Sequence, residues 1–265
     1  MFQWVASSDD PRLDPYRHVG DADWLRTQDL FVAEGRLIAD RLLGLDAYRI
    51  VSILVNRSAH EALRDRLAGS DANVYVCDDE VLAGVTGFNF HRGCLAIVRR
   101  PAPTPPERFL AASRLLALEG VGNPDNIGGL FRTAAAFGVD ALLLNSTTGD
   151  PFYRKAVRTS MGSVLQLPFA RVNDWPAGLD PFRRAGFTIV ALTPRPDAVP
   201  IDRFAATTSA PARIVVVVGA EGPGLGAGTM AAADALVRIP IAEAVDSLNV
   251  VVAAAVALER LRPRG

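Results

Sequence analysis

The chain has few of the residues that support metal, disulfide or nucleophilic chemistry. Its 265 residues include two cysteines and three histidines, and a single lysine stands beside 27 arginines. Two cysteines are too few for a disulfide framework or a zinc cluster. The histidines, His18, His60 and His91, are too scattered to form a metal pair at helical spacing. We therefore expect no bound metal and no Ser-His-Asp triad.

Long hydrophobic runs are also missing. The longest, such as Ile214–Val218 and Val250–Leu258, fall well short of the roughly 20 residues that a membrane-spanning helix needs. The first four residues are not a basic stretch that leads into an apolar core, so we expect no secretory signal. With 49% hydrophobic and 22% charged residues, the composition predicts a folded protein. We expect it in the cytoplasm, away from membranes.

Excess charge of either sign is absent as well. The net charge is −1, which counts against a nucleic-acid partner because such domains are often basic. The charges are unevenly distributed, however: residues 1–100 carry 12 arginines and 15 acidic residues, whereas residues 101–265 have a net charge of +2. Almost every cation is an arginine, whose planar group can hold a phosphate with two hydrogen bonds.

A proline-rich segment divides the chain. Four prolines lie within residues 101–106 and stop both helix and sheet, so residues 101–111 are predicted to form an interdomain linker. Residues 1–30 are polar and acidic, and we expect an N-terminal extension with a short helix near 21–30. Residues 31–100 predict a compact α/β domain, with helices at 31–43, 59–67 and 79–84 and strands at 50–55, 74–77 and 93–98.

After the linker, strands alternate with helices, which predicts an α/β domain with a parallel sheet over residues 112–265. The apolar run 214–218 lacks polar alternation, so it should form a strand that is buried on both faces. The other predicted strands are 114–118, 141–144, 187–192 and 236–239, with 164–169 extended. The predicted helices are 127–137, 151–159, 180–185 and 247–261.

The first of three unusual segments is residues 122–133, G-N-P-D-N-I-G-G-L-F-R-T. It is a polar turn between a strand and a helix, and Asn126 is a plausible N-cap for that helix. Arg132 would then lie between one and two turns into the helix. The alternative interpretation, an ordinary connecting loop with a surface arginine, remains open.

The second segment is a glycine-rich turn, residues 218–225, V-G-A-E-G-P-G-L. Its glycines let the backbone approach a ligand closely, and Glu221 adds one carboxylate. Gly222, Gly224 and Ala227 also fit the G-x-G-x-x-A spacing of a dinucleotide site, which would indicate a nicotinamide-dependent oxidoreductase. We disfavour that alternative because Pro223 removes a hydrogen-bond donor and the turn comes late in the chain.

The third segment is residues 239–250, I-P-I-A-E-A-V-D-S-L-N-V. Ser247 is a natural N-cap for the helix that follows. That helix is rich in alanine and valine, so it must pack against either the domain core or a partner subunit. One apolar stripe available for this contact consists of Val250, Val251, Ala254, Leu258 and Leu261.

Together the three segments resemble the motifs of the SpoU (TrmH-like) RNA ribose methyltransferases, a branch of the SPOUT superfamily. The resemblance covers about residues 112–262. It includes residues 153–162, Y-R-K-A-V-R-T-S-M-G, which look like the basic segment that these proteins carry between the first two motifs. Residues 31–100 are more loosely similar to the L30e/L7Ae-like RNA-binding domain, through 31–37 and 91–98.

The resemblance implies methyl transfer from S-adenosyl-L-methionine to a ribose 2′-hydroxyl of rRNA or tRNA. It also implies a trefoil knot near the C-terminus and a homodimer through the C-terminal domain. The implied catalytic residues are Asn126, Arg132, Glu221, Ser247 and Asn249. The implied cofactor-binding residues are Gly219, Glu221, Gly222, Gly224, Leu225, Ile239, Ile241, Ser247 and Leu248. The candidate RNA-binding residues are Arg154, Lys155, Arg158, Arg36 and Arg92.

Several alternatives stay open at this point. Arg132 could activate the hydroxyl as a base, although a guanidinium stays protonated in most proteins, or it could clamp a neighbouring phosphate as a cation. A protein that kept the fold and RNA binding but lost catalysis is the alternative function. The sequence does not predict which RNA is the target or what residues 1–30 do.

Overall fold

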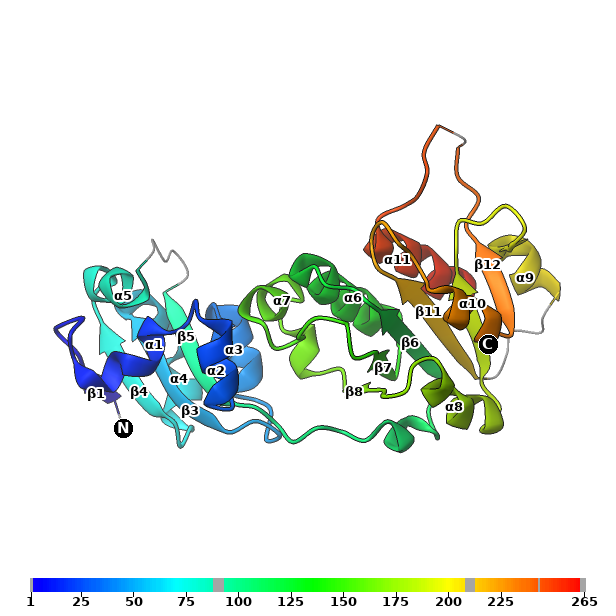
Figure 1. The fold of residues 1–265 in the computed structure, drawn as a ribbon. Coiled ribbons are helices and arrows are strands. Elements are labelled where there is room, and N and C mark those ends of the chain that lie inside the picture. Colours follow the sequence, from blue (N-terminus) through cyan, green and yellow to red (C-terminus); the bar gives the residue numbers. More distant parts are fainter. Residues whose placement is uncertain (1, 88–92, 208–212, 243, 263–265) are drawn as a thin grey trace. The chain divides into compact units, whose positions relative to one another are not determined.

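The computed structural model describes residues 2–87, 93–207, 213–242 and 244–262, and it consists of two compact units (Figure 1). The first unit comprises Met1–Ala102 and Pro151–Leu165, and the second comprises Pro103–Asp150 and Gln166–Gly265. One boundary lies in the proline-rich segment. Residues 151–165 were predicted to belong to the C-terminal domain, but in the structure they pack with the N-terminal unit.

The first unit is built on a five-stranded mixed sheet with the order β1-β4-β3-β5-β2. Strands β1, β4 and β3 are parallel, and β5 runs antiparallel to both β3 and β2. The predicted strands at 50–55, 74–77 and 93–98 correspond to β3, β4 and β5. The strand bounds are β1 Phe2–Trp4, β2 Leu30–Glu34, β3 Ile50–Asn56, β4 Asn73–Cys77 and β5 Cys94–Arg99.

The expectation of an N-terminal extension is wrong, because the first 30 residues belong to the core of this unit. Strand β1 pairs with β4 at the sheet edge. Val5, Leu13, Tyr16 and Val19 are buried in one hydrophobic cluster, and the Tyr16 hydroxyl donates to Ser52 Oγ at 2.7 Å. Apolar residues spaced among acidic ones therefore cover one face of the sheet, through α1 (Asp14–Arg17) and α2 (Ala22–Thr27).

The predicted helix at 31–43 is also wrong in its first part. Leu30–Glu34 is strand β2, and all five residues are buried. Gly35 follows with φ at +103°, a backbone conformation that glycine adopts readily. The helical periodicity therefore holds only after it, in α3 (Arg36–Leu42). The remaining helices of the unit are α4 Arg57–Ala68, α5 Asp79–Thr86 and α7 Arg154–Thr159.

The second unit contains a seven-stranded sheet with the order β10-β12-β9-β11-β6-β7-β8, in which the neighbouring strands are parallel. This confirms the predicted α/β class, while the trefoil knot stays a prediction. The strands are β6 Arg114–Glu119, β7 Ala141–Leu144, β8 Phe169–Arg171, β9 Thr188–Leu192, β10 Val199–Pro200, β11 Ile214–Gly219 and β12 Ala235–Arg238. The helices are α6 Pro124–Ala136, α8 Asp180–Arg184, α9 Ile201–Thr207, α10 Ala227–Ala232 and α11 Val250–Arg260.

The extended segment expected at 164–169 is mostly not a strand. Residues Ser163–Leu165 form a 3₁₀ turn in the first unit, and β8 begins only at Phe169. Further short 3₁₀ turns occur at Pro11–Leu13, Pro106–Phe109 and Ala177–Leu179. Within the described ranges, no helix has the length and apolar character that crossing a membrane requires.

The last helix, α11, packs inside its own unit, beside α6 and against β11 (Figure 1). Its apolar stripe is buried there, including Val250, Ala254, Leu258 and Leu261. The side chain of Val251 faces Gly129 of α6, where an added Cβ would come within 2.8 Å of Val251 Cγ2. The stripe therefore packs against the domain core rather than against a partner subunit, and it is not available for a dimer interface.

Candidate functional site

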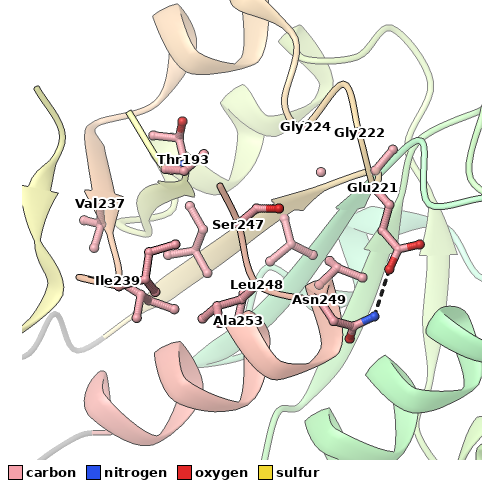
Figure 2. A pocket seen from close by; sticks show the side chains of 17 residues that line it. Thr193, Glu221, Gly222, Gly224, Val237, Ile239, Ser247, Leu248, Asn249 and Ala253 are labelled. Atoms are coloured by element: carbon pink, nitrogen blue, oxygen red, sulfur yellow. Dashed lines mark hydrogen bonds between the residues drawn. The ribbon is translucent and has the colours of Figure 1, made fainter. Parts of the chain in front are cut away.

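A pocket of about 440 Å³ lies at the carboxyl ends of β9, β11 and β12 (Figure 2). Its walls come from the end of β9, the glycine-rich turn after β11, and the segment that joins β12 to α11. Ligands of parallel α/β sheets bind at this edge. The lining residues are Leu192, Thr193, Pro194, Val218, Gly219, Ala220, Glu221, Gly222, Gly224, Val237, Ile239, Ile241, Ser247, Leu248, Asn249, Val250 and Ala253.

The glycine-rich turn is tightly folded. The Gly224 N–H donates to the Ala220 carbonyl at 3.0 Å, and Gly222 and Gly224 have φ of +87° and +67°. A Cβ on Gly219 would lie 2.3 Å from the carbonyl carbon of Gly224, so no side chain fits there. The glycines are needed for the shape of the pocket wall, and they leave its backbone groups accessible to a ligand.

Asn249 joins the three unusual segments of the sequence. Its Nδ2 donates to Glu221 Oε1 at 2.8 Å (Figure 2) and to Asn126 Oδ1 at 3.1 Å. Its Oδ1 accepts a hydrogen bond from the Val251 N–H at 2.9 Å and so caps α11. Because the cap occupies the oxygen, the amide nitrogen must face Glu221 and Asn126.

Two predicted helix caps are displaced by a few residues. Asn123, rather than Asn126, is the N-cap of α6 and accepts from the Asp125 N–H at 2.9 Å. Asn249, rather than Ser247, is the N-cap of α11. In both cases a second polar residue competes for the cap, and the displaced residue is left for the site. Asn126 is 7% exposed beside Asn249, and Ser247 lines the pocket.

The other predicted catalytic residue, Arg132, is placed differently. It is exposed on α6 and is not among the residues that line the pocket. In the part of the chain that the structure describes, it has neither an ion pair nor a hydrogen bond from its side chain. An exposed arginine without a partner suits a ligand larger than the pocket itself.

Most of the predicted cofactor residues line the pocket, and Leu225 does not. Leu225 is buried in the core of the second unit, against residues such as Val217 and Ile189. The lining residues Leu192–Pro194 and Val237 of β12 were not predicted from the sequence. The ends of the predicted strands at 187–192 and 236–239 were the available signal, because parallel strands share one carboxyl edge.

Glu119, the last residue of β6, also escaped sequence analysis. Its Oε1 accepts from the Gly226 N–H at 3.0 Å, which ties the residue after the glycine-rich turn to the neighbouring strand. A Cβ on Gly226 would come within 2.8 Å of that oxygen. Its Oε2 is buried and has no partner in the described part of the chain. Glu119 therefore holds the far end of the turn in place.

The basic residues expected to contact RNA lie in the first unit, and two of them share one carboxylate. Arg154 and Arg158 of α7 both form ion pairs with Glu34. Lys155 and Arg36 are exposed. Arg92 lies outside the described residues.

The charge of the pocket decides which ligands fit it. Glu221 is the one charged side chain among the lining residues; Thr193, Ser247 and Asn249 add neutral polar groups, and the other lining residues are apolar or glycine. Such a site suits a ligand with apolar parts and a positive group, as in a sulfonium, and does not suit a pyrophosphate. Helix α10 after the turn has only six residues, which also departs from a dinucleotide site. In the described residues, no cluster of histidine, cysteine or carboxylate side chains could hold a metal ion.

A parallel sheet with a pocket at its carboxyl edge defines a small-ligand-binding α/β unit. Residues 113–259 match the SpoU rRNA Methylase family, and the chain belongs to this family. The resemblance drawn from the three motifs is thus confirmed; the L30e-like character of the first unit stays a prediction.

Relatives match most or nearly all of the chain. An uncharacterized tRNA/rRNA methyltransferase of Mycobacterium bovis is 41% identical over 98% of this chain and 92% of its own. The 23S rRNA (guanosine(2553)-2′-O)-methyltransferase RlmP of Bacillus subtilis is 29% identical over 71% of this chain and 72% of its own. The structure of an AdoMet-bound rRNA methyltransferase from Sinorhizobium meliloti has a TM-score of 0.82 and 26% identity, and the match covers 98% of this chain and 97% of that one.

Proposed function

We propose that this SpoU-family protein transfers the methyl group of S-adenosyl-L-methionine to a ribose 2′-hydroxyl of ribosomal or transfer RNA. The observation that carries the proposal is the link from Asn249 to Glu221 and Asn126 at the mouth of the pocket. It joins the glycine-rich turn, the last helix and the first motif at one point. The relatives support RNA methylation in general, and the name of the Bacillus subtilis enzyme supports the 2′-oxygen as acceptor.

The residues of the pocket fit the proposed cofactor. The lining residues of the glycine-rich turn and of the segment before α11 would hold it, with apolar side chains such as Ile239 and Ile241 for its base and Glu221 for its positive charge. When bound, this cofactor supplies an electrophilic methyl group, whose transfer to a hydroxyl releases one proton. The chain itself must therefore orient a hydroxyl at the pocket mouth and give its proton a path away.

Polar side chains at the mouth can perform this orientation. Asn249 donates to one oxygen of Glu221, so the second carboxylate oxygen can accept from a ribose hydroxyl. Asn126 accepts from Asn249 through Oδ1, which leaves its own amide N–H groups as donors. Holding the hydroxyl in line with the methyl group converts an encounter between two molecules into a positioned reaction.

Arg132 is assigned to the RNA rather than to the cofactor. It is exposed and lies outside the pocket lining, and its planar cation can hold a phosphate next to the target ribose with two hydrogen bonds. We favour this clamp over a base, because a guanidinium remains protonated in proteins. The first unit is proposed to select the RNA.

We also propose that the protein is a homodimer. Because the apolar stripe of α11 is internal, the dimer contact would need other side chains of the second unit. Among the described residues of the second unit, Val199, Val245 and Val252 are exposed and could supply such a contact. A monomeric mass by light scattering at micromolar concentration would contradict the dimer without touching the methyl transfer.

The direct test uses the whole chain. Isothermal titration calorimetry should show binding of S-adenosyl-L-methionine, and incubation with RNA from a strain that lacks the gene should incorporate the methyl group. Mapping 2′-O-methyl positions in that strain against the parent would identify the target nucleotide. Cofactor binding with no methylation of any cellular RNA would favour the alternative, an RNA-binding protein without catalysis.

A further inference from the structure

We propose that Glu34, Arg154 and Arg158 form a phosphate clamp for RNA on the first unit, in which one buried carboxylate holds two arginines. This inference rests on the proposed function, because it takes RNA as the partner. It goes further by assigning a role to Glu34 and by giving segment 151–165 to the RNA-binding unit.

The three side chains form one cluster. Arg154 Nη1 lies 2.8 Å from Glu34 Oε2, and Arg158 Nη1 lies 3.5 Å from Glu34 Oε1. The Glu34 side chain is 5% exposed, whereas those of Arg154 and Arg158 are 25% and 34% exposed. The Glu34 carboxylate thus contacts both guanidinium groups, and both arginine side chains remain partly exposed to solvent. Residues four apart on a helix lie on the same side, so both arginines are presented together.

The cluster rests on a packed base. Glu34 ends the buried strand β2, and α7 packs against that strand. Phe152 stacks on Phe31 with ring centroids 4.6 Å apart, and Arg41 Nη1 donates to the Met161 carbonyl at 2.6 Å. Arginines held on such a base lose less side-chain freedom when they bind a phosphate than free surface arginines do.

The charge around the cluster suits a polyanion. Glu34 pairs with Arg154 and Arg158, and two exposed cations lie close in sequence, Arg36 two residues after Glu34 and Lys155 directly after Arg154. Residues 1–100 have 12 basic and 15 acidic side chains, and segment 151–165 adds three cations and no acidic residue. The segment therefore brings the net charge of these residues from −3 to zero.

Tyr153 adds a contact for a base. It is the N-cap of α7, directly before Arg154, and it is 40% exposed. Recognition of single-stranded RNA combines phosphate contacts with unstacked bases that lie on aromatic rings. A tyrosine next to two anchored arginines fits an RNA loop better than the regular phosphate ladder of a duplex.

The test measures RNA affinity with the full chain and a fluorescein-labelled RNA hairpin that has a single-stranded loop. Arg158→Ala should weaken binding by about tenfold, or roughly 1.4 kcal/mol. The dependence of log affinity on log salt should flatten by about 0.7–0.9 for the lost phosphate contact. Tyr153→Ala should weaken binding to the hairpin and leave its salt dependence unchanged.

Glu34→Gln separates anchoring from charge. It removes a negative charge, so affinity rises if only net charge matters. The RNA affinity falls several-fold if the carboxylate holds the arginines in place, as we propose. Arg57→Gln is the matched control, because Arg57 is also an exposed, ion-paired arginine and stacks on Trp4 of β1, at the sheet edge opposite β2. It should bind RNA like the wild type.

Cofactor binding, measured by calorimetry on the same samples, keeps the two proposals apart. Wild type that binds neither RNA nor S-adenosyl-L-methionine would overturn the proposed function. If wild type binds both, and Arg158→Ala and Glu34→Gln bind the hairpin as wild type does, only the clamp is overturned. Circular dichroism spectra that match the wild type show that a weak variant is folded; if Glu34→Gln unfolds, Arg158→Ala and Tyr153→Ala still decide the question.

Discussion

The two units of the chain gather their polar side chains in different ways. In the second unit, parallel strands end at one edge, so loops that are distant in sequence meet there as a pocket. In the first unit, the sheet is mixed, and the charged cluster forms where the single strand β2 meets α7. The first arrangement encloses a small ligand, whereas the second presents cations on a surface.

This difference indicates a division of labour between the units. Changes at the pocket should alter cofactor binding or turnover and leave RNA affinity nearly unchanged. Changes at the cluster around Glu34 should do the reverse. Arg132 is the residue of the second unit that should break this rule, because it is assigned to the RNA.

The largest effect is expected for Arg132→Ala. Loss of the phosphate clamp should lower the rate of methyl transfer at least about 100-fold, or roughly 2.7 kcal/mol. Cofactor affinity should stay within a few-fold, since the residue does not line the pocket. Single-turnover kinetics and calorimetry measure the two quantities.

The variant Arg132→Lys distinguishes the two roles of this residue. Lysine keeps the charge but lacks the planar fork, so a clamp should lose at least about tenfold in rate with little change in the pH profile. If the residue acts as a base, lysine should retain activity and move the alkaline limb of the profile to lower pH. A fully active Arg132→Ala enzyme would remove the residue from the mechanism.

Asn249→Asp should have the next largest effect. Aspartate still caps α11, but a carboxylate replaces the amide that donates to Glu221 and Asn126. Repulsion from Glu221 should cut turnover by more than about tenfold with little loss of thermal stability. Asn249→Ala loses the cap as well, and should cost about 1 kcal/mol of unfolding free energy. Equal turnover in wild type and Asn249→Asp would show that the link has no role.

Glu119→Ala tests whether the glycine-rich turn must be held in place for the cofactor to bind. The Gly226 N–H loses its acceptor, so the glycine-rich turn should loosen and cofactor affinity should fall by about three- to tenfold, since one hydrogen bond contributes about 1 kcal/mol. Glu119→Gln keeps an acceptor oxygen and should recover most of the affinity. If calorimetry finds both variants equal to wild type, Glu119 does not position the turn.

The smallest expected effect is a loss of stability of the first unit at alkaline pH. Burial raises the pKa of Cys77 and of Cys94 to about 12, above the ordinary 9.0. The neutral thiols therefore stabilise the folded state below about pH 9, and this contribution is lost as the pH rises toward 12. At neutral pH a thiol reagent should modify both cysteines only as fast as the unit unfolds. Rapid labelling of the folded protein would contradict their burial.

How much the sequence could predict differs between the units for a physical reason. In the second unit, strand ends and glycine turns lie next to the residues they position, so local patterns locate Glu221, Ser247 and Asn249. Leu225 belongs to the same motif yet points into the core, and no local pattern gives the direction of a side chain after a tight turn.

In the first unit, local patterns were less informative. The sequence L-F-V-A-E before Gly35 supports a strand or a helix equally well until its pairing with β5 is known. The contact of Arg154 with Glu34 joins residues 120 positions apart, and no spacing rule reaches that far. Competing caps, Asn123 against Asn126 and Asn249 against Ser247, were likewise decided by tertiary contacts.

The central claim, methyl transfer to a ribose 2′-hydroxyl, has one direct measurement. Purified chain is incubated with RNA from a strain that lacks the gene and with a cofactor that carries a labelled methyl group. The RNA is then digested to nucleosides and analysed by mass spectrometry. We predict that the label appears on the ribose oxygen of one nucleoside and disappears with Arg132→Ala. A label on a base, or no label on RNA that the chain binds, would contradict the account.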